Sequence, residues 1–128
     1  MKRLALLLAL LGCLCLAAPA VAHNLYRKPR VGVTGDIFTF KGTKWQPNSY
    51  VYWEYFARPG DDEPVQQGSV VAGRRGKFKF RFRDFNLGKH KMCFGQVDTR
   101  YPPRARSSGF GNGRLFYKCK KYRVFGTD

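Results

Sequence analysis

Residues 77–83 of this chain read KFKFRFR, so that a basic residue stands at every second position and a phenylalanine at the positions between. In a β-strand, successive side chains point to opposite faces. This spacing therefore predicts a strand with one aromatic face in a core and one cationic face in water. The chemistry offered by the cationic face is the binding of phosphate, sulfate or carboxylate groups by Lys and Arg. Its candidate binding residues are Lys77, Lys79, Arg81 and Arg83.

The whole chain is strongly basic, with 24 Lys and Arg against 8 Asp and Glu and a formal net charge of +16. A field of this sign attracts polyanions in a salt-dependent way. We expect Lys89 and Lys91 on a ladder next to 77–83, further cations on the last strand, and three arginines in the loop 98–113. These further candidates are Lys89, Lys91, Arg100, Arg104, Arg106, Lys118, Lys120 and Lys121.

The expected ligand is an anionic polymer, with envelope glycans, lipopolysaccharide and extracellular nucleic acid as the candidates. A second interpretation assigns these charges no ligand. Basic residues also keep an aromatic-rich domain soluble and protect sheet edges from pairing. The chain would then be a structural module or would bind a protein partner.

Catalytic motifs are missing from the sequence. Glycoside cleavage needs two carboxylates close together, and nothing in the sequence brings two of Asp36, Glu54, Asp84 and Asp98 together. The glycine-rich run at 109–113 lacks the Lys-Ser/Thr pair and the helix of a phosphate-binding loop. We therefore expect a binding protein without enzymatic activity or cofactor.

Copper and glycans are two further ligands to consider. After removal of residues 1–22, the amine and imidazole of His23 would offer copper two ligands, and His90 is the only other histidine. The alternation of residues 89–97 turns His90 inward, where a core histidine is the commoner outcome, so no metal site is assigned. For glycans, the candidate aromatic contacts are Trp45, Trp53, Tyr50 and Tyr52. Trp45, in a predicted turn, is the preferred one, because Trp53, in the middle of a predicted strand, is expected in the core.

The N-terminus has the pattern of an export signal. A short cationic start is followed by thirteen apolar residues at 4–16, too few to span a bilayer. Ala20-Val21-Ala22 then fits the small-x-small cleavage rule. We expect a signal peptide at 1–22, a single domain at 23–128, and a secreted, extracellular protein.

Cys93 and Cys119 are the two cysteines that remain in the expected domain. In an exported domain such a pair favours one disulfide. Two free thiols or half of a metal site are the alternatives. The predicted bond joins the last two strands and closes the base of the loop 98–113.

Short β-forming segments separated by turn residues run through the expected domain, and none has helical period. This spacing predicts an all-β antiparallel sandwich, or a small barrel, of about seven strands. The segments are 23–33, 36–42, 50–58, 65–72, 77–83, 89–97 and 114–125.

Gly42-Thr43-Lys44-Trp45-Gln46-Pro47-Asn48-Ser49-Tyr50-Val51 resembles the G-x-G-F-x-P-G-x-x-V motif that opens immunoglobulin-like modules of bacterial exported and surface proteins. The patterns Gly76-x-Phe78 and Gly88-x-His90-x-Met92 resemble later strand starts of the same modules. Lys44, Trp45, Asn48 and His90 depart from the motifs. The resemblance covers about residues 36–95 and implies an immunoglobulin-like sandwich, but no function, since such sandwiches host many activities.

Overall fold

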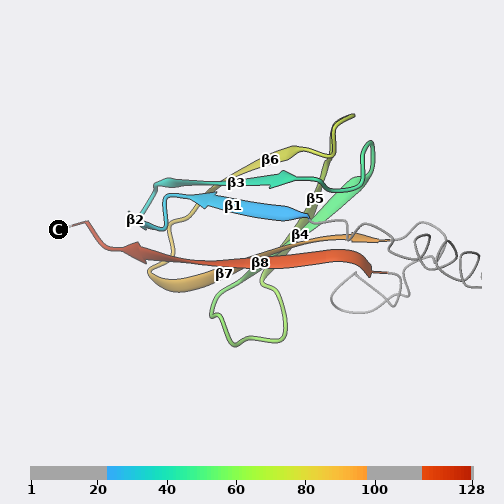
Figure 1. The fold of residues 1–128 in the computed structure, drawn as a ribbon. Coiled ribbons are helices and arrows are strands. Elements are labelled where there is room, and N and C mark those ends of the chain that lie inside the picture. Colours follow the sequence, from blue (N-terminus) through green and yellow to red (C-terminus); the bar gives the residue numbers. More distant parts are fainter. Residues whose placement is uncertain (1–22, 98–113, 128) are drawn as a thin grey trace, which may run out of the picture.

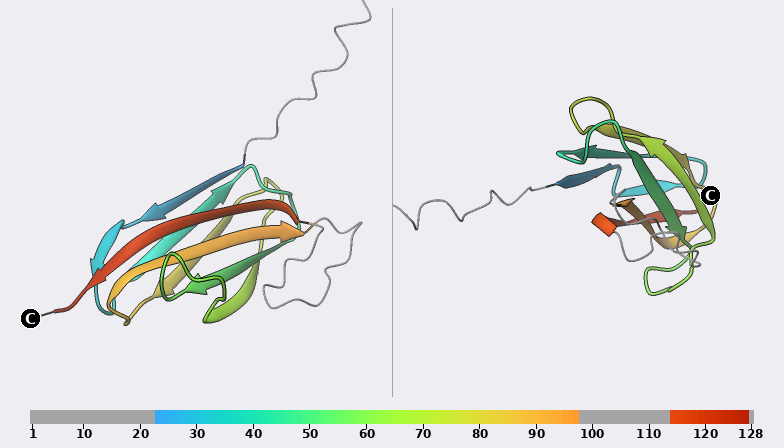
Figure 2. Two further views of the ribbon diagram at one scale, coloured as in Figure 1. Left: turned by 90° about the horizontal axis from the view of Figure 1, so that it is seen from below. Right: turned by 90° about the vertical axis from the view of Figure 1, so that its right-hand side faces the viewer.

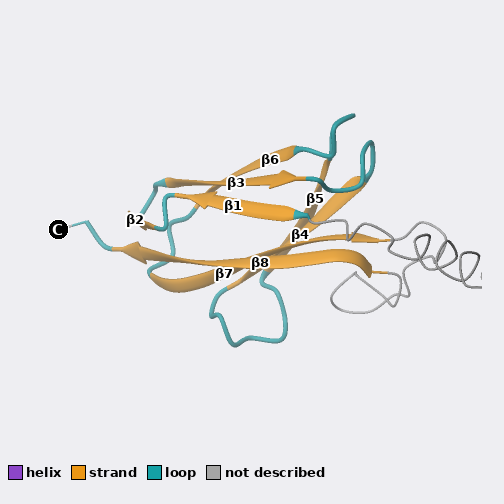
Figure 3. Ribbon diagram, viewed as in Figure 1, coloured by secondary structure: helices purple, strands orange, loops and turns teal. Residues whose placement is uncertain are grey.

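The computed structural model describes residues 23–97 and 114–127, and these residues form strands, turns and loops without a helix (Figure 3). They therefore include no helix with the length and apolar character needed to cross a bilayer. The strands are β1 (Asn24–Lys28), β2 (Val31–Val33), β3 (Ile37–Thr43), β4 (Tyr50–Phe56), β5 (Gln66–Val71), β6 (Phe78–Arg83), β7 (Gly88–Val97) and β8 (Arg114–Phe125).

Two sheets face each other as the layers of a sandwich (Figures 1 and 2). One sheet has the order β1-β3-β6 and the other the order β2-β8-β7-β4-β5. All pairings are antiparallel except that of β2 with β8. The pairing of β3 with β6, and the place of β7 between β4 and β8, are those of immunoglobulin-like sandwiches. The predicted fold class is confirmed.

The first predicted strand, 23–33, is two strands in the structure. Pro29 follows β1 directly and Arg30 forms a bend before β2. Because proline cannot donate to a ladder, the chain can leave one sheet at this point and enter the other. β1 pairs with β3, whereas β2 pairs with β8. This split accounts for eight strands where about seven were expected.

The phenylalanines of β6 face the core, as predicted. Phe78 is buried, and Phe80 and Phe82 pack against the core cluster from its margin. The ring of Phe80 stacks on Trp53 of β4 with 4.8 Å between centroids. Phe78 lies 5.3 Å from Phe94 of β7. Each ring removed from water contributes roughly 1.5–3 kcal/mol, which fixes the register of the strand.

The inner face of β4 carries Val51, Trp53 and Tyr55. The Trp53 ring lies against Gly68, its partner on β5, so closely that a Cβ at position 68 would overlap the indole. Glycine at this point of an edge strand therefore makes room for the largest ring of the core.

The turn after β3 corrects one expectation. Trp45 is only 3 % exposed, and its Nε1 donates to the Asn24 carbonyl at 2.8 Å. Its ring meets those of Phe78 and Phe116 edge to face. Trp45 is thus a core residue that joins β1 to the turn, and its predicted role as an exposed glycan contact is wrong.

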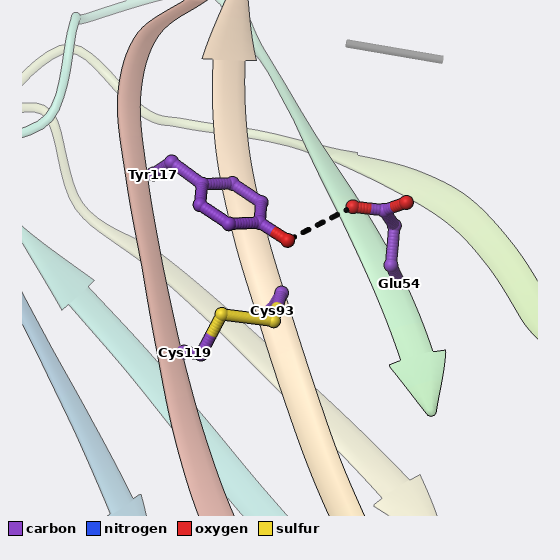
Figure 4. Close-up of a disulfide and its surroundings, with 4 residues drawn as sticks. All are labelled: Glu54, Cys93, Tyr117 and Cys119. Carbon is purple, nitrogen blue, oxygen red and sulfur yellow. Dashed lines mark hydrogen bonds between the residues drawn. A yellow bond between two sulfur atoms is a disulfide. The ribbon is translucent and has the colours of Figure 1, made fainter. Parts of the chain in front are cut away.

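The predicted disulfide between Cys93 and Cys119 is confirmed (Figure 4). The two residues are directly opposite each other on β7 and β8. Cys93 lies between the core residues Met92 and Phe94, so the bond is on the outer face of the five-stranded sheet. There the Tyr117 hydroxyl donates to Glu54 Oε1 at 3.3 Å.

Removing this bond by Cys93→Ala and Cys119→Ala lowers the free energy of unfolding. The bond spans 26 residues, for which the loss of chain entropy in the unfolded state corresponds to about 3 kcal/mol. We expect a lower urea midpoint with a native far-ultraviolet circular dichroism spectrum in buffer. An unchanged midpoint would contradict this.

Candidate polyanion-binding site

The four cations predicted from residues 77–83 are together on one surface. Lys77, Lys79, Arg81 and Arg83 are exposed at or beside β6, on the outer face of the three-stranded sheet. Arg83 also donates from Nη1 to the Gly35 carbonyl at 2.9 Å, which holds its side chain against the turn before β3.

Lys89 and Lys91 do not continue this surface, so the expected neighbouring ladder is wrong. β6 and β7 follow each other in sequence but belong to different sheets. Because the outer faces of the two layers point in opposite directions, Lys89 and Lys91 are on the other side of the sandwich from Arg81. There Lys121 is the direct partner of Lys91 on β8.

The remaining predicted cations fall into two groups. Lys118 and Lys120 pair with Phe94 and Met92, so they are on the inward side of β8. Lys118 is nevertheless exposed and Lys120 half-buried, and at this margin β8 runs beside β1 (Figure 2). The arginines Arg100, Arg104 and Arg106 of the loop 98–113 are outside the described residues.

Directly opposed positive charges recur on both outer faces. Like charges in this position destabilise a sheet. Within 23–97 and 114–127, none of the opposed cations named below forms an ion pair with a described carboxylate, so no described acidic neighbour offsets their repulsion. The opposed pairs are Lys41 with Lys79, Lys89 with Arg123, and Lys91 with Lys121.

A hollow of about 320 Å³ collects five cations from β1, the connection between β1 and β2, β7 and β8. We call it the cationic hollow. No carboxylate is among the described residues that line it. These are Arg27, Arg30, Val31, Pro59, Lys89, Lys121, Tyr122 and Arg123.

A second hollow of about 400 Å³ involves the three-stranded sheet and adds Tyr26, whose side chain is 56 % exposed. Arg27 lines both hollows. Cations therefore continue from one sheet to the other around the edge formed by β1 and β2. We call the surface made by the residues of the two hollows the basic belt. The second hollow is lined by Tyr26, Arg27, Lys28, Thr39, Lys41 and Lys79.

Arg27 is the clearest example of an unfavourably placed positive charge in the basic belt. Burial, followed by repulsion from Arg30, lowers the pKa of its guanidinium. Its Nε is buried and has no hydrogen-bond partner among the described residues. Both effects are unfavourable in the free protein. An anionic group beside Arg27 would relieve both.

Several belt residues were missed by the sequence interpretation, which concentrated on the later strands. The available signal was the density of cations in Arg27-Lys28-Pro29-Arg30. It could not be interpreted because the segment has no strand alternation over most of its length. Only the contact of β1 with β8 shows that these cations adjoin those of the five-stranded sheet.

The two histidines are too far apart to share a copper ion. The His23 ring lies 4.3 Å from that of Phe116, the partner of Gln96 on β7. His90 is six residues earlier on the same strand, about 20 Å away at the usual strand rise. The described residues contain no cluster of three or more possible metal ligands. The inward orientation predicted for His90 is confirmed, since it is 2 % exposed.

His90 belongs to a buried polar cluster under the turn between β6 and β7. Its Nδ1 and Nε2 each lie 2.8 Å from a backbone carbonyl oxygen, that of Ala57 and that of Asn86. The Tyr55 hydroxyl also lies 3.2 Å from Nδ1, and Asp84 Oδ2 lies 3.9 Å from Nε2. The cluster thus fastens two loops to β7.

Asp84 is 1 % exposed and is held by groups from two directions. The Tyr122 hydroxyl donates to Oδ2 at 2.7 Å, and the Asn86 backbone N–H donates to Oδ1 at 2.8 Å. Burial, with the nearby Asp84 charge, raises the pKa of Tyr55 to about 12. Burial and the hydrogen bond to Asp84 raise the pKa of Tyr122 as well.

Comparisons with known proteins support the fold class but assign this chain to no family. No protein-family model and no curated protein matches the sequence. Among solved structures, macromomycin matches with a TM-score of 0.51 and 11 % identity over 81 % of this chain and 100 % of that one. WR4, a C. elegans MSP family member, matches with a TM-score of 0.38 and 16 % identity over 80 % and 97 %. The macromomycin likeness supports the β-sandwich alone.

Tyr122→Phe removes the donor to a buried carboxylate and lowers the free energy of unfolding by about 1–3 kcal/mol. It also changes the alkaline behaviour. Tyrosines of the unfolded chain lose their protons near pH 10, whereas Tyr55 and Tyr122 retain theirs to higher pH in the fold. The contribution of these two tyrosines to the free energy of unfolding is therefore fully present below pH 10 and is lost as the pH rises above it.

Urea titrations between pH 8 and 12 measure this fall, which we expect to be shallower in Tyr122→Phe. The exposed Tyr26→Phe serves as the matched control. Equal slopes in the two variants would contradict the role given to Tyr122.

Proposed function

We propose that this protein is an exported, non-catalytic module that binds anionic polymers along the basic belt. The observation that carries the proposal is the meeting of two cationic hollows at Arg27, whose buried Nε lacks a partner among the described residues. Export is supported by the pattern of residues 1–22 and by the disulfide, which persists in oxidising compartments.

The shape of the belt favours a polymer over a small anion. It offers charged groups on two layers that join around one edge, so a chain of phosphates, sulfates or carboxylates can contact many of them in succession. Arg27, Arg30 and Arg123 supply planar donors suited to such oxyanions. Tyr26 adds an exposed ring on which a sugar or a base can pack. Envelope glycans, lipopolysaccharide and nucleic acid all meet these requirements.

Retention on immobilised heparin tests the belt. Arg30→Ser with Arg123→Ser removes two belt cations, and we expect elution at clearly lower salt than for the wild type. In titrations with heparin, polyphosphate or poly(dT), the plot of log affinity against log salt should lose about two from its slope.

The matched control is Arg74→Ser with Arg75→Ser, which removes the same charge from the exposed turn between β5 and β6. We expect this variant to elute close to the wild type. If both double variants elute together, retention follows net charge and the belt is not a site. In the titrations, the relative affinities for heparin, polyphosphate and poly(dT) rank the ligand classes. Stacking on Tyr26 would favour poly(dT).

A further inference from the structure

One end of the sandwich carries most of the exposed apolar side chains. Among the described residues, nine large hydrophobic side chains are exposed, and three of them (Tyr26, Tyr50 and Val71) are elsewhere. The other six are on β2, on the last residue of β8, in the turn between β6 and β7, and on the residue before β5. Figure 1 shows β2, the end of β8 and the turn between β6 and β7 together at its left. They are Val31, Val33, Val65, Phe85, Leu87 and Phe125.

Contacts between these segments make the six residues one surface, which we call the apolar end. Val33 is the partner of Phe125 in the ladder of β2 and β8. A Cβ at Gly126 would lie 3.8 Å from Leu87, and one at Gly35 would lie 3.5 Å from Phe85. Leu87 and Val65 line one hollow of about 640 Å³.

Two of the most exposed members are on one turn, which hydrogen bonds hold in place. Phe85 is 67 % and Leu87 63 % exposed. The buried Asp84 binds this turn through the Asn86 backbone N–H, and its own carbonyl accepts from the Gly35 N–H at 2.8 Å. The Phe85 carbonyl accepts from Thr34 Oγ1 at 3.0 Å. Turn tips are usually polar, so a fixed turn presenting a phenylalanine and a leucine marks a contact surface.

Cations adjoin this apolar end at β8, at the start of β7 and at the turn before β3, while Asp36 and the acids at 61–63 lie near Val33 and Val65. Arg123 lies over the Phe125 ring, 4.9 Å from its centroid. Arg83 is fixed to the Gly35 carbonyl beside Phe85. Val31 and Lys89 also line the cationic hollow, so the basic belt begins at the margin of the apolar end.

Apolar tips with Arg83, Lys89 and Arg123 beside them match a lipid surface with anionic headgroups. The rings and the leucine can enter the boundary of the acyl chains while the cations reach the phosphates. A water-soluble anionic polymer has charged groups for the cations but no acyl chains to contact the apolar end. A second copy of this chain would bring like charges together, since each carries a formal net charge of +16.

We propose that the apolar end docks onto anionic lipid surfaces, with Phe85 and Leu87 at the level of the acyl boundary and Arg83, Lys89 and Arg123 on the headgroups. This adds a lipid surface to the polymer contact of the basic belt. Lys89 and Arg123 belong to both surfaces, whereas Phe85 and Leu87 belong to the apolar end alone, so substitutions at these two residues test the lipid contact separately from the polymer contact.

Vesicle co-sedimentation of the exported protein tests the proposal. Wild type should bind vesicles of phosphatidylcholine with phosphatidylglycerol at least about tenfold more tightly than phosphatidylcholine alone. Phe85→Ser with Leu87→Ser should weaken that binding by about tenfold or more, while retention on heparin stays unchanged. The matched control, Tyr50→Ser with Val71→Ser, removes exposed apolar groups from other positions and should bind vesicles as the wild type does.

Depth of insertion supplies a second measurement. Leu87→Trp should show a blue shift of its emission on anionic vesicles and quenching by brominated acyl chains, and Tyr50→Trp should show neither. Vesicle binding that is unaffected in the Phe85/Leu87 double variant, or an indole at position 87 that the brominated chains leave unquenched, would mean adsorption by charge alone and overturn the proposal. If the wild type is a dimer without lipid and the Phe85/Leu87 double variant is a monomer, the apolar end is a self-association surface, and this result would also overturn the proposal.

Discussion

The packing of the β6 phenylalanines against β4 and β7 is the contact on which the rest of the structure depends. Phe80 on Trp53, Phe82 on Tyr55 and Phe78 on Phe94 join the three-stranded sheet to the five-stranded one. Because strand side chains alternate, every ring turned inward turns a neighbouring cation outward. The core and the charged surface of β6 are therefore one feature, and a shift by one residue would bury Lys79 and Arg81.

The positive surface also follows from where the carboxylates are. Asp84 and Glu54 are buried, the former in the cluster with Tyr122 and His90, the latter beside Tyr117. Asp36 accepts from the Val33 backbone N–H. Three further acids stand together at 61–63 in the loop between β4 and β5. The basic belt is thus left with opposed like charges, a state that favours capture of anions over stability.

Both proposed surfaces meet around β2 and the end of β8. Val31, Lys89 and Arg123 lie where the basic belt passes into the apolar end. A lipid surface that carries a polyanion would present phosphate groups to the basic belt and hydrocarbon to the apolar end. The cluster of Asp84, Tyr122 and His90 is directly behind this junction. Its hydrogen bonds hold the turn of Phe85 and Leu87, so the proposed contact surface is formed in the free protein.

The sequence alone specified most of the strands, the inward faces of β3, β6 and β7, and the disulfide, because alternation and cysteine count are local properties. Phe38, Phe40 and His90 face inward as their spacing predicts. It could not specify which sheet each strand joins: β6 and β7 are consecutive but lie in different layers. That choice separated Lys89 and Lys91 from Arg81, and it brought Arg27 and Arg30 beside Arg123. Only the tertiary structure decides such neighbours, since pairing across the sandwich depends on contacts between distant segments and not on the pattern within any one of them.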